Sequence, residues 1–126
     1  MSHFTTIEIE IRDIEALEYT CEELGVGLEK NAEARGFGNN RRKADYVIRL
    51  NGPYDVALNK QSDGSYKVET DLWNKSVEKE LGSGLGRLKQ MYAVNKASRE
   101  ARRKGYSVTK EVLPNKNIRL RVMSLA

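Results

Sequence analysis

Basic side chains recur at a fixed spacing in the C-terminal third of the chain. Lys89, Lys96 and Arg103 lie seven residues apart, so a helix places them along one edge. Residues 87–126 contain eleven basic and two acidic side chains. Clustered lysine and arginine bind polyanions such as nucleic acid, because counterions are released from the phosphates. The spacing therefore predicts an electrostatic contact surface along this helix edge.

Acidic side chains concentrate at the other end of the chain. Residues 1–34 contain nine acidic and two basic side chains, and Glu15, Glu18 and Glu22 share one edge of a predicted helix. Two helices lying side by side would match the acidic edge to the basic one, within one chain or across a dimer. We favour such matching, or an ordinary solvated surface, over nucleic-acid binding, because surface charge governs association more than it specifies function.

Further residues are candidates for contact with a partner protein. Asn95 and Arg99 continue the apolar stripe of the same helix, so either the helix extends past the sheet there or the two form a polar network at a contact surface, which we favour. Trp73 has the opposite parity to the apolar positions and is expected to be exposed, as interface anchors are. The predicted partner-binding set is Lys89, Lys96, Arg99, Arg103, Asn95, Trp73, Arg119 and Arg121.

Residue types that support catalysis or bind metals are sparse. The chain has one histidine, His3, and one cysteine, so neither a zinc ligand set nor an internal disulfide is expected, and a reducing compartment fits best. Cys21 falls on an apolar helix stripe and is expected to be a small buried hydrophobe. We predict no enzyme, no catalytic residue, no metal and no cofactor, and expect turn-forming or solvated roles for the acids Asp45, Asp55, Asp63, Glu69 and Asp71.

A glycine-rich run interrupts the predicted basic helix. Gly82, Gly84 and Gly86 each disfavour a helix interior by about 1 kcal/mol. The run resembles a phosphate cradle at a helix start, where free N–H groups attract anions. The match is weak, because the strand and the Lys-Ser/Thr pair of known phosphate motifs are absent. A flexible helix entry is the favoured interpretation.

The periodicity of the apolar residues indicates the elements that position these groups. Residues 4–12 alternate as a half-buried strand, and Asp13 and Gly25 bracket a helix over 14–24. Alternation over residues 46–72, broken at Asn51-Gly52-Pro53 and Asp63-Gly64, predicts an antiparallel meander. Residues 25–43 give only a weak signal, for a loop or a loose hairpin. A long helix is predicted to end near Gly105. It begins either at Ser76, in which case something must approach its glycine backbone closely, or near Ser83 to Arg87, and a closing hairpin follows over 106–122.

The predicted fold class is α+β, as one domain over residues 1–126. An antiparallel sheet of about five to seven strands should carry two helices on one face, in the order strand, helix, strands, helix, strand, strand. Tyrosines 46, 54, 66 and 106 share the parity of the core positions, which disfavours a sheet that stacks RNA bases. No apolar run approaches the ~20 residues of a bilayer crossing, and the start lacks a secretion signal, so no membrane contact is expected.

Several motifs resemble a known family. They are the opening Met1-Ser2-His3-Phe4, Tyr54-Asp55-Val56-Ala57, Gln90-Met91-Tyr92-Ala93-Val94-Asn95 and Lys104-Gly105-Tyr106. This pattern is similar to the hypothetical chloroplast reading frame thirty-five family, conserved proteins of unknown function in plastids, cyanobacteria and other bacteria. Val94 stands where members usually have a second aromatic residue, which fits a divergent or phage-borne relative.

The resemblance implies a small accessory factor in the cytoplasm, or in the plastid stroma if it is encoded there. It supplies no catalytic residues, and it suggests an ATPase-containing complex as a partner. We therefore predict a non-enzymatic adaptor or regulatory protein that acts through protein contact. The alternative is nucleic-acid binding through the basic C-terminal helix.

Overall fold

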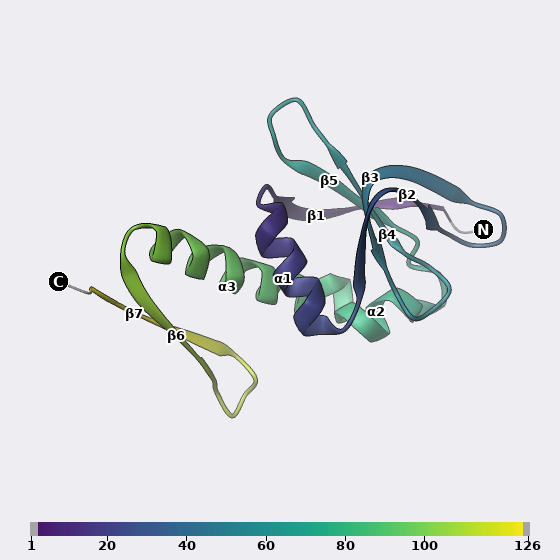
Figure 1. The fold of residues 1–126 in the computed structure, drawn as a ribbon. Helices are drawn as coiled ribbons and strands as arrows, with labels where there is room; N and C mark the ends of the chain where they lie inside the picture. Colours follow the sequence, from purple (N-terminus) through teal and green to yellow (C-terminus); the bar gives the residue numbers. More distant parts are fainter. Residues whose placement is uncertain (1–2, 125–126) are drawn as a thin grey trace.

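The computed structural model describes residues 3–124, so Met1 and Ser2 of the opening motif lie outside it. Figure 1 shows a sheet with helices packed beside it, while the C-terminal part of the chain extends away from the sheet. The elements, in chain order, are β1 (Thr5–Ile11), α1 (Ile14–Leu24), β2 (Gly27–Arg35), β3 (Arg41–Arg49), β4 (Val56–Lys60), β5 (Tyr66–Thr70), α2 (Ser76–Leu81), α3 (Gly86–Arg103), β6 (Tyr106–Val112) and β7 (Ile118–Ser124), with 3-10 turns η1 (Trp73–Lys75) and η2 (Ser83–Leu85) beside α2.

The first five strands form one antiparallel sheet in the order β1-β5-β4-β3-β2. The predicted meander is confirmed as β3, β4 and β5, which are neighbours in space as well as in sequence. Gly64, at φ 89°, turns the chain between β4 and β5, as the Asp-Gly signal predicts. The connection around Gly52 is longer than a tight turn, because β3 ends at Arg49 and β4 begins at Val56. Residues 25–43, where the sequence signal is weak, contain β2 and the start of β3, which pair as a hairpin.

The helices share one core with one face of this sheet. Asp13 caps α1 by accepting a hydrogen bond from the Ala16 N–H at 3.1 Å, and Gly25 ends the helix at φ 72°. Both predicted ends are therefore confirmed. Cys21 is buried as expected, and burial raises the pKa of its thiol to about 12. The most deeply buried side chains of this core are Ile11, Leu17, Ile48, Val56, Leu58, Val77, Leu81, Leu85 and Leu88.

Of the two starts left open for the basic helix, the later one is confirmed, because α3 begins at Gly86, and a continuous helix from Ser76 is wrong. The backbone leaves the helical region at Gly82 (φ 88°), Gly84 (φ 58°) and Leu85 (φ 61°), so α2 and α3 are separate helices. Three helices rather than two therefore pack on the sheet. The Gly84 N–H donates to the Glu78 carboxylate at 2.7 Å, so within this glycine run one N–H of the kind that a phosphate cradle would use binds the chain's own acid.

The C-terminal hairpin does not join the main sheet, contrary to the prediction of one sheet of up to seven strands. Strands β6 and β7 pair only with each other among the described residues. Figure 1 shows α3 continuing past the sheet and the hairpin folding back beneath its far end. Arg119 and Arg121, two of the predicted partner-binding residues, therefore lie on this separate hairpin and not on the main sheet. Tyr106, predicted to be in the core, is 40% exposed.

Two acids expected to be solvated are fully buried. Asp55 and Asp71 have no exposed surface. The Asp55 carboxylate accepts hydrogen bonds from the Arg35 guanidinium at 2.8 and 2.9 Å and from the Leu50 N–H at 3.1 Å, and it also pairs with Arg49. Tyr54 is buried as predicted. The sequence pattern missed the acids because a carboxylate beside a turn usually faces water.

Candidate functional site

The second half of α3 and the C-terminal hairpin, residues 95–124, form a projection that we call the arm. Asn95 fixes its base and is only 4% exposed. Its Nδ2 donates to Thr20 Oγ1 at 2.9 Å and to Glu23 Oε1 at 2.7 Å, while its Oδ1 accepts from Lys110 Nζ at 2.7 Å. The predicted polar network therefore exists, but it joins α1, α3 and β6 internally. The prediction that Asn95 lies on an open contact surface is wrong.

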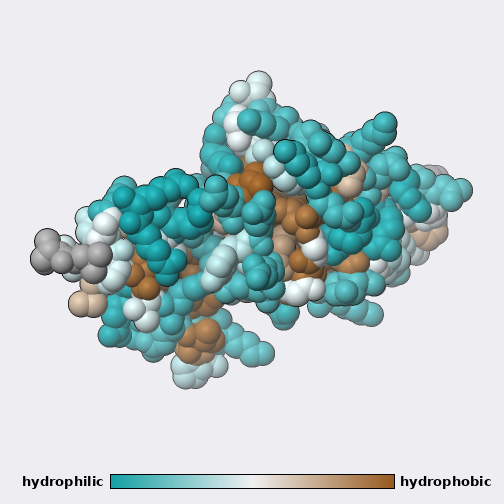
Figure 2. Space-filling view, in the orientation of Figure 1, coloured by the Kyte–Doolittle hydropathy of each residue, from teal (hydrophilic) through white to brown (hydrophobic). Residues whose placement is uncertain are grey.

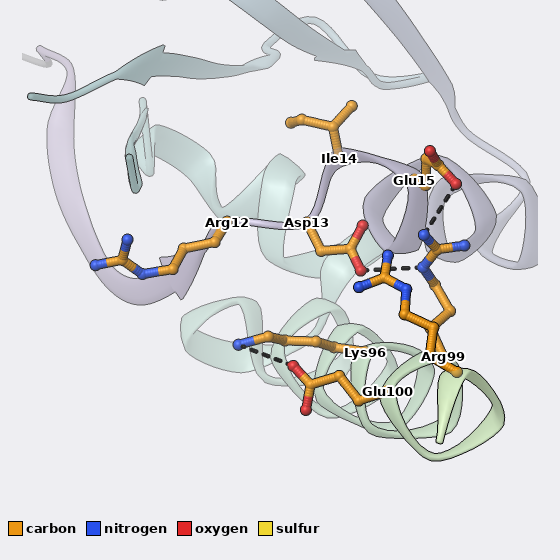
Figure 3. A pocket seen from close by; sticks show the side chains of 8 residues that line it. Arg12, Asp13, Ile14, Glu15, Lys96, Arg99 and Glu100 are labelled. Atoms are coloured by element: carbon orange, nitrogen blue, oxygen red, sulfur yellow. Dashed lines mark hydrogen bonds and ion pairs between the residues drawn. The ribbon is translucent and has the colours of Figure 1, made fainter. Parts of the chain in front are cut away.

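Arg99 holds the same helices together one turn further along. Its guanidinium pairs with Asp13 at 3.0 Å and with Glu15 at 2.9 Å, as Figure 3 shows. Burial opposes ionisation of Asp13, but hydrogen bonds from the Ala16 N–H and from Arg99 outweigh it and hold the pKa of Asp13 below its ordinary value. The charge of Arg99 is thus neutralised within the chain, as internal matching of the two helices predicts for this residue.

The basic helix edge lines a shallow groove of mixed charge. Lys96 pairs with Glu100 at 3.9 Å, and Figure 3 shows both beside Arg99 and Glu15. Arg103 also lines this groove, whereas Lys89 lies further back on α3. Acids and bases alternate around the groove, so the edge is less cationic than its lysines and arginines suggest. This arrangement weakens it as a polyanion surface.

The hairpin has one apolar and one polar face. Cross-strand partners share a face, so Val108 and Val122 lie together, as do Val112 and Ile118. The opposite face carries the pairs Thr109 with Arg121 and Glu111 with Arg119, together with Met123. Arg119 and Arg121 each approach Glu111 at 3.9 Å. These two arginines therefore form a polar face of the arm.

The apolar face of the hairpin is only partly covered by α3. Val112 is 71% exposed and Val122 is 48% exposed, and no residue of β6 or β7 in the described chain is fully buried. In Figure 2 brown, apolar surface is visible at the lower left, where Figure 1 places the hairpin. Exposed apolar surface rimmed by polar groups marks interaction sites.

Between α3 and this face lies a groove of about 360 Å³, which we call the arm groove. Its apolar lining comes from Met91 and Val94 of α3 and from Val112 and Ile118 of the hairpin. Polar side chains surround this lining, namely Glu23, Arg87, Gln90, Lys110 and Lys116. None of these residues belongs to the partner-binding set predicted from the sequence. The one signal in the sequence was Lys110, a charged residue with the parity of the apolar positions.

Trp73 is exposed, as predicted, but lies far from the arm in the chain. It is 51% exposed on η1, and its ring meets that of Phe37 edge to face, with 5.8 Å between centroids. The predicted partner-binding set is therefore divided: Arg99 and Asn95 act inside the molecule, Arg119 and Arg121 lie on the hairpin, and Trp73 belongs to a second surface.

Comparison with known proteins identifies relatives without assigning an activity. A family described as protein of unknown function (DUF1257) matches residues 20–120. The chain is 27% identical over 115 residues to the uncharacterized protein ycf35 of Pyropia yezoensis, a match that covers 89% of this chain and 88% of that protein. No solved structure matches the chain. Within residues 3–124, every helix is too short or too polar to cross a bilayer.

Proposed function

Since the chain belongs to the DUF1257 family of proteins of unknown function, whose match confirms the resemblance drawn from its motifs, we propose its role from the site itself. The protein is a small non-enzymatic adaptor or regulatory factor that binds a segment of another protein in the arm groove. The observation that carries this proposal is the half-covered apolar face of the hairpin.

An isolated two-stranded hairpin is marginally stable in water, and it needs an apolar neighbour on one face. Here α3 supplies part of that neighbour and leaves Val112 and Val122 in solvent. A partner segment in the arm groove completes the layer and removes this surface from water. Each apolar residue buried in this way contributes about 25 cal/mol per Å² of area.

The rim of the groove indicates the chemistry of the partner. Lys110 is already paired with Glu23 at 3.3 Å, whereas Arg87 and Lys116 make no ion pair with another described residue. A segment that presents apolar side chains flanked by carboxylates matches both the lining and the rim. Charge complementarity of this kind speeds association and excludes basic partners.

Photo-crosslinking from inside the groove tests the proposal. A crosslinking amino acid at Val112 should capture a partner in cells, and the captured protein should then bind the purified chain. The same amino acid at Met123, exposed on the opposite face of the same hairpin, is the matched control. Val112→Asp should weaken the reconstituted complex at least about tenfold, or 1.4 kcal/mol. Equal capture from both positions, or unchanged affinity of the variant, would contradict the proposal.

Nucleic-acid binding through the basic edge of α3 stays the alternative prediction. Reversing Lys89, Lys96 and Arg103 to Glu should abolish any gel shift seen at low salt, and affinity should fall steeply as salt rises. The internal pairing of Lys96 and Arg99 favours the protein-binding proposal. An ATPase-containing complex as the partner, a stromal or cytoplasmic location and dimer formation also remain predictions.

A further inference from the structure

Two exposed aromatic rings lie together on the surface formed by the β2–β3 turn and η1. Phe37, in the turn, is 45% exposed, and Trp73, in η1, is 51% exposed. Their ring planes are inclined at 71° with centroids 5.8 Å apart. In this arrangement the edge of one ring contacts one face of the other, so the pair is not a closed parallel stack. Large aromatic residues are costly to hold in water, so their exposure as a pair needs an explanation.

A buried carboxylate joins the two backbone segments that carry the rings. Asp71 has no exposed surface, and it accepts hydrogen bonds from the Phe37 N–H at 2.9 Å and from the Trp73 N–H at 2.9 Å. One side chain therefore joins two segments that are more than thirty residues apart. The backbone that carries the two rings is therefore fixed, while the rings themselves remain exposed.

The backbone after Trp73 adopts an unfavourable conformation. Asn74 and Lys75 have φ values of 54° and 60°, a region that non-glycine residues rarely occupy. The Asn74 side chain supports the turn by accepting from the Ser76 N–H at 3.1 Å. Such conformations persist only where the surrounding structure enforces them, and they cluster at functional sites. Here they turn the chain away directly after the exposed indole.

Exposed cations lie within a few residues of each ring along the chain. Lys75 is exposed two residues after Trp73. Arg41 is exposed at the other end of the β2–β3 turn, and its guanidinium donates to the carbonyl oxygens of Gly38 and Asn40 at 3.2 and 2.7 Å. Arg42 and Lys43 follow it, and Arg42 pairs with Glu69 at 3.3 Å. The surface therefore combines open aromatic rings with a cationic border.

We propose that Phe37 and Trp73, with Arg41 and Lys75, bind single-stranded nucleic acid at this surface. Unstacked bases lie on the aromatic rings, and the phosphates that connect them are bound by the two cations. Proteins that bind single strands without sequence preference use this combination of stacking and charge. The site is distinct from the arm groove and does not depend on a partner bound there. It also differs from the basic α3 edge, which lacks an exposed aromatic ring.

Trp73 reports directly on the proposed site, because it is the sole tryptophan of the chain. Titration with a short oligothymidylate at low salt should quench its fluorescence to saturation, as base stacking requires. The matched probe is heparin, a polyanion without bases, which should bind without comparable quenching. Absence of quenching by the oligonucleotide, or equal quenching by heparin, would overturn the stacking proposal.

Two variants separate the contribution of base stacking from the contribution of charge. Phe37→Ser should weaken binding of a labelled oligothymidylate, measured by anisotropy, at least about fivefold, the lower end of the loss for one base stack. Lys75→Asn keeps a residue that tolerates positive φ and should reduce the slope of log affinity against log salt by about 0.7, the value for one phosphate contact. Tyr19→Ala, which removes another exposed ring from the acidic helix α1, should leave affinity unchanged. Equal effects of Phe37→Ser and Tyr19→Ala, or stronger binding of an acidic peptide than of the oligonucleotide, would contradict the proposal.

Discussion

The arm differs from the rest of the molecule in how its side chains are buried. Ile48, Leu58 and Leu88 have no exposed surface, and even the ionic cluster around Asp55 is closed off from water on the carboxylate side. The arm, in contrast, is attached through the polar contacts of Asn95 and Arg99 and leaves its valines in solvent. We infer from this difference that the free energy of unfolding comes mainly from the sheet and its helices. The arm is held in position by polar contacts, and its apolar face is only partly covered.

The largest effect is expected at Asp55. Asp55→Ala leaves Arg35, Arg49 and two backbone N–H groups without their shared acceptor. Breaking a buried ion pair costs about 3–5 kcal/mol, and we expect the lower end because the two arginine side chains remain 35% and 30% exposed. Urea unfolding followed by circular dichroism measures the loss. A loss no greater than that of a surface substitution would show that the cluster is not structural.

The same carboxylate makes the sheet acid-sensitive. Burial raises the pKa of Asp55, but hydrogen bonds from Arg35 and from the Leu50 N–H outweigh it, so the pKa lies below its ordinary value. Stability from a depressed pKa is present above the unfolded-state value of about 3.9 and is lost as pH falls through the folded-state pKa. Unfolding midpoints measured between neutral pH and about pH 3 should therefore fall more steeply in the wild type than in Asp55→Asn. Parallel pH profiles would contradict this.

A pair of truncations compares the two regions directly. Leu88→Ala opens a cavity in the core and should cost about 2–5 kcal/mol. Val112→Ala, in the arm, should change the free energy of unfolding by no more than about 0.5 kcal/mol, since its side chain is 71% exposed. Denaturant midpoints give both values. Comparable losses would mean that the hairpin is part of the cooperative core.

The attachment of the arm depends on Asn95. Asn95→Ala removes contacts to Thr20, Glu23 and Lys110, and it should cost about 1–3 kcal/mol. Hydrogen exchange should accelerate in β6 and β7 more than in β3 and β4, because the arm loosens before the sheet opens. Ser98→Ala is the control one turn away, since Ser98 Oγ is buried without a hydrogen-bond partner in the described chain and its loss should be nearly neutral. Uniform acceleration across the chain would argue against a separately attached arm.

A small stabilising effect is expected at the junction where α3 begins. Gly86 has helical φ, and a Cβ added there would meet open space, so Gly86→Ala should stabilise the protein by about 0.4–1 kcal/mol. Gly84→Ala, two residues earlier, places a side chain at φ 58° and should destabilise it instead. Thermal unfolding of the two variants shows the sign. A destabilised Gly86→Ala would mean that the junction needs flexibility.

Local patterns predicted the elements of the sheet but not the separation of the arm. The cap at Asp13, the left-handed Gly25 and the Asp63-Gly64 turn each depend on neighbouring residues, so the sequence is sufficient to predict them. The alternation of Tyr106 and Val108 indicates a strand but is the same whether that strand joins the main sheet or forms its own hairpin. Which partner a strand takes depends on contacts that sequence periodicity does not contain.

The candidate sites show the same limit. Asn95 meets Thr20 across 75 positions of sequence, and Arg99 meets Asp13 across 86, so helix periodicity identified the residues but not their roles. Phe37 lay in a region of weak signal, and its pairing with Trp73 follows from how Asp71 joins two loops. Trp73 was predicted to be exposed because strand parity is local, and that expectation agrees with the structure.

Both outer edges of the β6–β7 ribbon lack a neighbouring strand within the described residues. Unpaired strand edges are templates for self-assembly, so we expect this ribbon to be the segment through which concentrated protein forms ordered aggregates. Arg119 and Arg121 oppose in-register stacking, because identical ribbons would bring like charges together.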